Sequence, residues 1–128
     1  MRIISWNVNG IRASVKKGLI DQINSHQADI WCFQETKAQD DQVIEALSDL
    51  SSKYHIQSTS AVKKGYSGVA ILAKKSTFGE AAPSWSSGLS IDEHDQEGRV
   101  LRFNGGDFFL VNVYVPNSSS GMKRLPYR

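Results

Sequence analysis

Two segments of the sequence predict strands that are apolar on both faces, and this feature constrains the fold most. Residues 30–34 read Ile-Trp-Cys-Phe-Gln. Residues 108–115 alternate between two apolar sets, which are Phe108 and Leu110 on one face and Phe109, Val111 and Val113 on the other. Strands of this kind belong to sheets with a packed layer on each face. The chain must therefore cover both faces of these strands or leave an apolar face bare.

The order of the predicted elements supplies helices for one face. An apolar run at 3–8, a helical periodicity at 14–27 and a strand at 29–34 form a strand–helix–strand unit, whose two strands should be parallel. The remaining pattern predicts a helix over 40–52, strands over 54–62 and 69–73, a long loop with a short edge strand over 76–98, and a hairpin of 100–103 with 108–115. We expect an α/β fold with a mixed sheet and helices on one face. The sequence shows no obvious cover for the other face.

Composition limits the classes of protein that fit. The chain has 128 residues, a net charge of +2, 40% hydrophobic residues and 22% charged residues, as in one soluble globular domain. Its N-terminus enters a strand without the layout of a signal peptide, and no apolar run approaches the roughly 18 residues of a membrane span. The one cysteine, Cys32, excludes an internal disulfide. We therefore expect a cytoplasmic protein with no membrane association.

Polar residues follow the predicted strands at positions where α/β sheets bind ligands. Asn7 ends the first strand, Glu35 follows the second, and Tyr114 and Asn117 close the last. Each has an ordinary structural explanation: Asn7 as a turn former, Glu35 as an exposed carboxylate and Tyr114 as a core aromatic with a satisfied hydroxyl. Spacing alone thus predicts an α/β domain without a defined chemistry.

Five ordered motifs change that interpretation. They are WNVNGIRA at 6–13, FQETK at 33–37, GYSGV at 65–69, DQEGRV at 95–100 and YVPN at 114–117. Together they resemble the exonuclease III family of apurinic/apyrimidinic (AP) endonucleases, within the DNase I-like endonuclease/exonuclease/phosphatase superfamily. The first two motifs are shared across the superfamily, and the last three indicate the exonuclease III branch. The resemblance covers the whole chain.

The resemblance implies a fold and a boundary. The family fold is a four-layer αββα sandwich, and residues 1–128 resemble its N-terminal half. The Gly-Asp-Phe-Asn and Ser-Asp-His motifs of the C-terminal half do not occur in this sequence. We therefore expect half of the sandwich, with most of the second sheet missing.

The resemblance also implies roles for the residues at the strand ends. Glu35 matches the carboxylate that holds catalytic Mg²⁺, with Mn²⁺ as an alternative, and Asn7 matches the asparagine of the same metal site. Tyr114 matches the tyrosine that contacts the scissile phosphate, and Asn117 matches a residue near that phosphate. The positions that match the family's DNA surface are Asn9, Arg12, Lys37, Tyr66 and Arg99.

The function implied for the parent enzyme is Mg²⁺-dependent DNA repair. It would hydrolyse the phosphodiester 5′ to an abasic site in double-stranded DNA, and trim 3′ ends, as a monomer. One alternative is a superfamily phosphodiesterase acting on another phosphoester. The other is a non-catalytic fragment that binds DNA weakly or self-associates through its exposed sheet face. For the 128-residue chain alone, we expect no catalytic activity.

Overall fold

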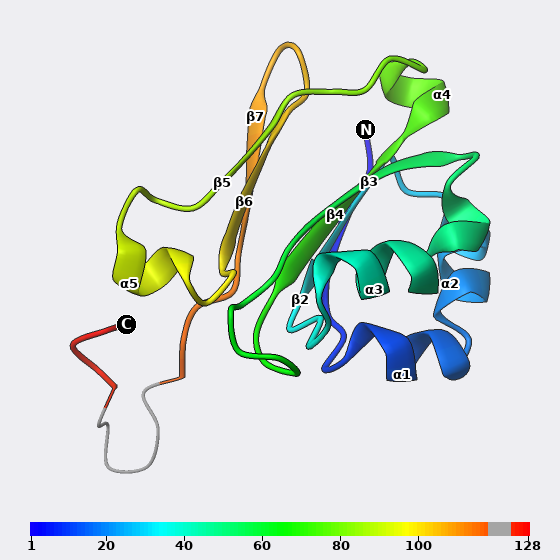
Figure 1. Ribbon diagram of the computed structural model, residues 1–128. Helices are drawn as coiled ribbons and strands as arrows, with labels where there is room; N and C mark the ends of the chain where they lie inside the picture. The colour runs from blue at the N-terminus through cyan, green and yellow to red at the C-terminus, as the bar shows by residue number, and fades with distance from the viewer. Residues whose placement is uncertain (118–123) are drawn as a thin grey trace.

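The computed structural model describes residues 1–117 and 124–128, which form two stacked β-sheets, with the helices within residues 11–46 on the outer side of one of them (Figure 1). The four-stranded sheet has the order β1-β2-β4-β3, and the three-stranded sheet has the order β5-β6-β7. The strands are β1 (Ile3–Asn7), β2 (Ile30–Gln34), β3 (Tyr54–Thr59), β4 (Val69–Lys74), β5 (Trp85–Ser87), β6 (Val100–Asn104) and β7 (Phe109–Val113). The helices are α1 (Ile11–Lys16), α2 (Leu19–His26), α3 (Asp40–Ala46), the 3₁₀ turn η1 (Ser48–Leu50), α4 (Lys75–Phe78) and α5 (Asp92–Asp95).

The first sheet is mixed, as the sequence predicts. β1 runs parallel to β2, with Asn7 opposite Gln34, while β4 pairs antiparallel with both β2 and β3. The predicted helix over 14–27 is divided, because Gly18 adopts a left-handed conformation (φ 101°) between α1 and α2. The predicted helix over 40–52 is α3 followed by η1.

Helices α1, α2 and α3 cover one face of the first sheet (Figure 1). Apolar side chains from the helices, such as Ile11, Ile23 and Val43, pack there against Trp31 and Phe33 of β2. Burial of this kind contributes about 25 cal/mol per Å² of apolar surface. One face of β2 is therefore covered by the predicted helices.

The opposite face of β2 is covered by the chain's own second sheet, which corrects the expectation that the chain holds no cover for this face. Leu101 and Phe103 of β6 are buried against Ile30, Cys32 and Ile71 of the first sheet. The predicted hairpin is β6–β7, and the predicted edge strand in the long loop is β5. The described residues thus form three layers, in the order helices, sheet, sheet.

The bare apolar face lies on the outside of this second sheet. Phe109, Val111 and Val113 of β7 are 63%, 52% and 45% exposed, whereas Leu110 faces the first sheet. Among residues 1–117 and 124–128, β7 is also an edge strand, since β6 is its one neighbour in the sheet. We call Phe109, Val111 and Val113 the outer β7 face. Within the described residues, no helix is long and apolar enough to cross a membrane.

Candidate functional site

The carboxyl ends of β1 and β2 bring Asn7 and Glu35 together. The two strands are parallel neighbours, so their carboxyl ends meet at one edge of the sheet. The Asn7 side-chain amide donates a hydrogen bond to Oε1 of Glu35 over 3.3 Å, and Oδ1 of Asn7 accepts from the Asn9 backbone over 3.0 Å. The local turn after β1 therefore aims the Asn7 side chain at Glu35.

Two further predicted residues converge on the same carboxylate. The Tyr114 hydroxyl, from the segment after β7, donates to Oε1 of Glu35 over 3.0 Å. The Lys37 ammonium lies 3.1 Å from Oε2 of Glu35 and donates to Oδ1 of Asn9 over 2.7 Å. The Glu35 side chain is 19% exposed, so it remains open to solvent. Three segments far apart in the sequence thus meet at one carboxylate.

The backbone around Glu35 is held in an unusual conformation. Glu35 and Lys37 have positive φ angles of 58° and 53°, a conformation that costs non-glycine residues energy and that clusters at functional sites. Backbone hydrogen bonds hold the turn, from Gly10 to the Glu35 carbonyl at 2.8 Å and from Lys37 to the Ser67 carbonyl at 2.8 Å. Gly68 closes the turn, because a Cβ there would meet Thr36 Oγ1 at 2.2 Å.

The protonation states suit an anionic site. Partial burial of Glu35 opposes ionisation, but hydrogen bonds from Lys37, Asn7 and Tyr114 outweigh it and hold the pKa of its carboxyl below the usual value. Burial and the bond to Glu35 raise the pKa of the Tyr114 hydroxyl. Glu35 is therefore ionised and Tyr114 is protonated at neutral pH, so the site holds an acceptor and a donor side by side.

The donor set fits a hard divalent cation in part. The Glu35 carboxylate is a ligand that Mg²⁺ takes, and Mg²⁺ keeps several waters. The Asn7 amide turns its N–H₂ toward Glu35 and its oxygen toward the Asn9 N–H, so in this arrangement the carboxylate is the better ligand. Among residues 1–117 and 124–128, no three His, Cys, Asp or Glu side chains group so as to hold a metal. Glu35 and Asn7 therefore supply at most a partial protein coordination shell.

The predicted DNA-surface residues fall into two groups. Asn9, Arg12 and Lys37 lie together beside Glu35, with the Arg12 guanidinium donating to the Lys37 carbonyl over 3.2 Å. Tyr66 and Arg99 lie in a second cluster, and Arg99 is only 5% exposed. Asn117 is exposed beyond Tyr114.

The second cluster is centred on Glu97, a residue that the sequence interpretation missed. Its carboxylate accepts from Arg99 at 2.8 Å, from Arg124 at 2.6 Å and from the Tyr66 hydroxyl at 2.7 Å. Partial burial opposes its ionisation, but these bonds dominate and lower the pKa of Glu97 to about 2. The available signal was the glutamate two positions before Arg99 in the DQEGRV motif.

The Glu97 cluster contacts the Glu35 site through Tyr114. Arg99 donates to the Tyr114 carbonyl over 3.2 Å, and its guanidinium lies 4.9 Å from the centre of the Tyr114 ring. The contact of Arg99 with DNA stays a prediction. In this structure two of its nitrogens donate to protein groups, which are Glu97, the Tyr66 hydroxyl and the Tyr114 carbonyl.

Asn112 is a second residue that the sequence interpretation missed. It is buried on β7, its amide donates to the carbonyls of Phe33 and Ala70 at 2.9 Å each, and its oxygen accepts from Gln34 at 2.8 Å. These bonds fasten β7 to the first sheet. They therefore set where Tyr114 lies relative to Glu35.

Known proteins are similar to this chain in sequence and in fold. The model of the "Endonuclease/Exonuclease/phosphatase family" matches residues 4–127. An exodeoxyribonuclease of Bacillus subtilis and the DNA repair nuclease APEX1 of Danio rerio are each 43% identical over the whole chain, which spans 48% and 40% of their lengths. Crystal structures of an AP endonuclease from Leishmania major and of the APE2 catalytic domain from Xenopus laevis superimpose with TM-scores of 0.76 at 33% and 32% identity. The alignments cover 98% and 99% of this chain, and 43% and 49% of those chains. The chain thus spans about half the length of these relatives, or less.

Proposed function

Because this chain belongs to the Endonuclease/Exonuclease/phosphatase family, we propose that it forms part of a DNA repair nuclease of the exodeoxyribonuclease III and AP endonuclease type. Its substrate is double-stranded DNA, hydrolysed on the 5′ side of abasic sites and trimmed at 3′ ends. The observation that carries the proposal is the convergence of Asn7, Tyr114 and Lys37 on the Glu35 carboxylate. The names of the relatives, which are DNA repair nucleases and AP endonucleases, support the substrate.

In this proposal Glu35 and Asn7 hold Mg²⁺ or Mn²⁺. The bound metal supplies positive charge against the phosphoryl and leaving oxygens. The Tyr114 hydroxyl, which donates to Glu35 in this structure, would turn its hydrogen to the scissile phosphate, where negative charge develops, and Asn117 would lie at the same phosphate. Lys37, already 3.1 Å from the carboxylate, adds positive charge at this edge of the site.

DNA binding would rest on the residues around this edge. Asn9, Arg12 and Lys37 present a polar and basic surface beside Glu35. Tyr66 and Arg99, which the resemblance also assigns to the DNA surface, lie in the Glu97 cluster, where Arg99 is only 5% exposed. Contacts of Arg and Lys with phosphates release counterions, so affinity for duplex DNA should fall steeply as salt increases. We further propose a cytoplasmic location, which suits a chain whose one cysteine is buried and unpaired.

The 128-residue chain alone should bind metal without turnover. We propose that it corresponds to the N-terminal half of the family domain, and its sequence contains neither the Gly-Asp-Phe-Asn nor the Ser-Asp-His motif. Removing members of a catalytic group that acts as a unit costs far more than any single contact. Metal binding is therefore the property that tests Glu35 directly.

The test is Mn²⁺ binding followed by electron paramagnetic resonance. Glu35→Gln should weaken binding by about tenfold or more, because it removes the metal carboxylate. Glu45→Gln, an exposed carboxylate on α3, serves as the matched control and should bind as the wild type does. Equal Mn²⁺ affinity in the wild type and Glu35→Gln would refute the metal site. Cleavage of an abasic duplex by the pure chain would refute the claim that it is inactive alone.

We also propose that the chain self-associates, which is favoured by the outer β7 face. This face joins exposed apolar side chains to the unpaired edge of a strand, a combination that templates pairing with another chain. The sequence interpretation expected a bare face that combines one face of residues 30–34 with one face of residues 108–115. Of these two segments, the exposed apolar side chains lie on the outside of β7 alone, because Ile30 and Cys32 are buried. Two copies of β7 in antiparallel contact would form a self-complementary twofold interface.

Sedimentation at micromolar concentration tests this association. The wild type should sediment as a dimer or larger species, and Val111→Lys should shift it to a monomer of 14.2 kDa. Val62→Lys changes an apolar residue that is 76% exposed but lies outside the outer β7 face, and should leave the association unchanged. A wild-type monomer that binds no hydrophobic dye would contradict the proposal.

A further inference from the structure

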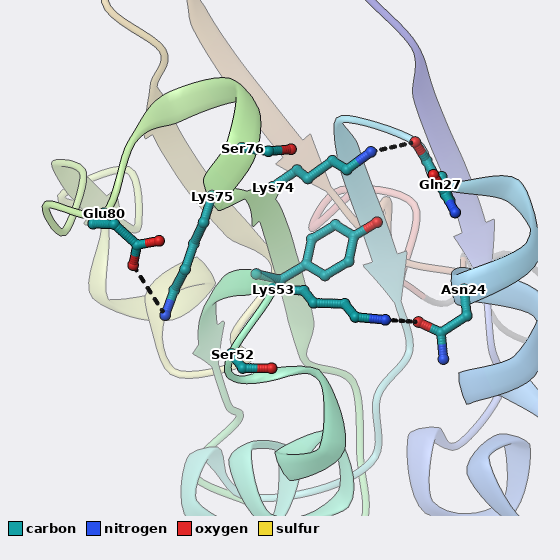
Figure 2. A pocket seen from close by; sticks show the side chains of 9 residues that line it. Asn24, Gln27, Ser52, Lys53, Lys74, Lys75, Ser76 and Glu80 are labelled. Atoms are coloured by element: carbon teal, nitrogen blue, oxygen red, sulfur yellow. Dashed lines mark hydrogen bonds and ion pairs between the residues drawn. The ribbon is translucent and has the colours of Figure 1, made fainter.

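A second concave site lies at the end of the first sheet away from Glu35. Residues of α2, of the start of β3 and of the β4–α4 junction enclose a cavity of about 350 Å³ (Figure 2). The register of β4 fixes its distance from the candidate active site, because Val69 lies opposite Gln34 while Ala73 lies opposite Ile30. At about 3.3 Å per residue, the length of β4 separates the two sites by roughly 15–20 Å.

Three lysines give this cavity a positive charge. Lys53, Lys74 and Lys75 line it, and the one carboxylate in its lining, Glu80, is 85% exposed and lies 4.0 Å from Lys75. Within residues 1–117 and 124–128, neither Lys53 nor Lys74 has a carboxylate within 4.0 Å. The cavity lining therefore carries three positive charges against the one carboxylate of Glu80, with Asp29 as a further carboxylate near Lys74.

The ammonium groups keep donors free. Lys74 donates to the Gln27 carbonyl at 3.3 Å and Lys53 to the Asn24 side-chain oxygen at 3.4 Å, as Figure 2 shows. An ammonium has three N–H donors, so each of these lysines retains two. The nearby Asp29 carboxylate attracts Lys74 electrostatically, but it forms no ion pair with it within 4.0 Å and accepts its hydrogen bonds from Thr77 and from the Arg2 backbone.

Two hydroxyls complete the donor set. Ser52 and Ser76 line the same cavity, and no hydrogen bond joins either hydroxyl to another described residue. The lysine bonds to the Gln27 and Asn24 oxygens explain one donor of each ammonium, as at many helix C-termini. They do not explain why three ammonium groups and two unpartnered hydroxyls surround one cavity.

We propose that this cavity binds a small anion carrying a phosphate group. The oxygens of a phosphate or diphosphate accept several hydrogen bonds at once, and lysine ammonium groups bind phosphate as point charges. The unengaged donors of Lys53 and Lys74, with the Ser52 and Ser76 hydroxyls, meet that demand. The site is separate from the Glu35 site, so it stands or falls independently of the proposed nuclease function.

A nuclear magnetic resonance titration tests the site on the 128-residue chain. Pyrophosphate, added to ¹⁵N-labelled protein at constant ionic strength in chloride, should shift the amide signals of residues 52–54 and 74–76 with saturation. The variant Lys53→Met/Lys74→Met keeps the aliphatic stems and should bind about tenfold more weakly or worse, because it removes two charge-assisted donors. The control Lys16→Met/Lys17→Met removes the same charge from an exposed site and should bind as the wild type does. Should the double variant fail to fold, as judged by its spectrum, Lys74→Met alone takes its place.

The competing explanations have distinct outcomes. Shifts that do not saturate, or that the two double variants share equally, would show nonspecific charge screening and would overturn the proposal. A second arm uses a short DNA duplex, whose phosphates are the other source of this chemistry. Stronger shifts at residues 52–54 and 74–76 with the duplex than with pyrophosphate would also overturn the assignment to a small anion.

Discussion

Replacing Glu97 by glutamine should remove the charge that compensates the buried arginine of the fold. Glu97→Gln keeps the size of the side chain and leaves Arg99, which is 5% exposed, without its 2.8 Å carboxylate partner. Glutamine keeps one acceptor oxygen, so Arg124 or the Tyr66 hydroxyl loses its short bond, because the two use different oxygens of the Glu97 carboxylate. A buried cation without a partner pays its desolvation cost uncompensated, so the folded state should lose stability.

The pKa of Glu97 gives the magnitude. It lies at about 2 in the folded protein and near 4.5 as its ordinary value. The shift corresponds to at most about 3 kcal/mol at neutral pH. Since the folded pKa is depressed, this stabilisation is complete above pH 4.5 and is lost as the pH falls toward about 2. Removing one partner of a buried pair typically costs about 3–5 kcal/mol, so Glu97→Gln should cost about 3 kcal/mol at pH 7.

Urea denaturation at pH 7, 4 and 3, followed by tryptophan fluorescence, measures this loss. The difference between wild type and Glu97→Gln should shrink as the pH falls, because protonation removes the same charge from the wild type. Glu93→Gln, an exposed neighbour in the acidic segment, should unfold as the wild type does at each pH. A difference below about 0.5 kcal/mol at pH 7, or one that does not change with pH, would refute the reasoning.

Two substitutions and one labelling experiment test the second layer and the core. Phe103→Ala should lower the free energy of unfolding by about 3–5 kcal/mol in urea melts, because it opens a cavity between the sheets; a loss below about 1 kcal/mol would show that the layers are not packed there. Gly98→Ala should abolish folding or strongly lower the melting temperature that circular dichroism measures, since φ is +59° and a Cβ would collide with the Ser60 carbonyl carbon. A wild-type melting temperature would contradict this geometry. Cys32 should resist a thiol reagent in the native state and react on unfolding, because burial raises the pKa of its thiol to about 11; rapid native-state labelling would contradict its burial.

The sequence predicts the local parts of this fold well, because they follow from short-range patterns. The strand–helix–strand unit requires β1 and β2 to be parallel, and parallel neighbours bring Asn7 and Glu35 to one edge. Alternating apolar residues likewise predict the β6–β7 hairpin, which the structure confirms. The division of the predicted helix at Gly18 could also be predicted, since glycine readily takes the left-handed conformation that it adopts there.

The packing between the layers could not be predicted from the sequence, for a physical reason. The continuous apolar run at residues 30–33 shows that both faces of β2 are apolar. Apolar contact is nondirectional, so the run does not indicate which segment packs on each face. The second face of β2 is covered by β6. The sequence interpretation placed this segment in the same sheet as β2. The Glu97–Arg124 pair has the same character, because its partners are far apart in the sequence and no local pattern joins them.

The precision of the candidate site depends on polar anchors between the two sheets. Tyr114 and Glu35 come from different sheets, and apolar packing of β6 on β2 would permit small shifts of β7 along the interface. Hydrogen bonds are directional, so the bonds of Asn112 to the Phe33 and Ala70 carbonyls fix that shift. Arg99 then holds the Tyr114 backbone from the neighbouring strand. The 3.0 Å bond between Tyr114 and Glu35 is thus a consequence of buried polar contacts, which lie outside the residues that the site itself would use.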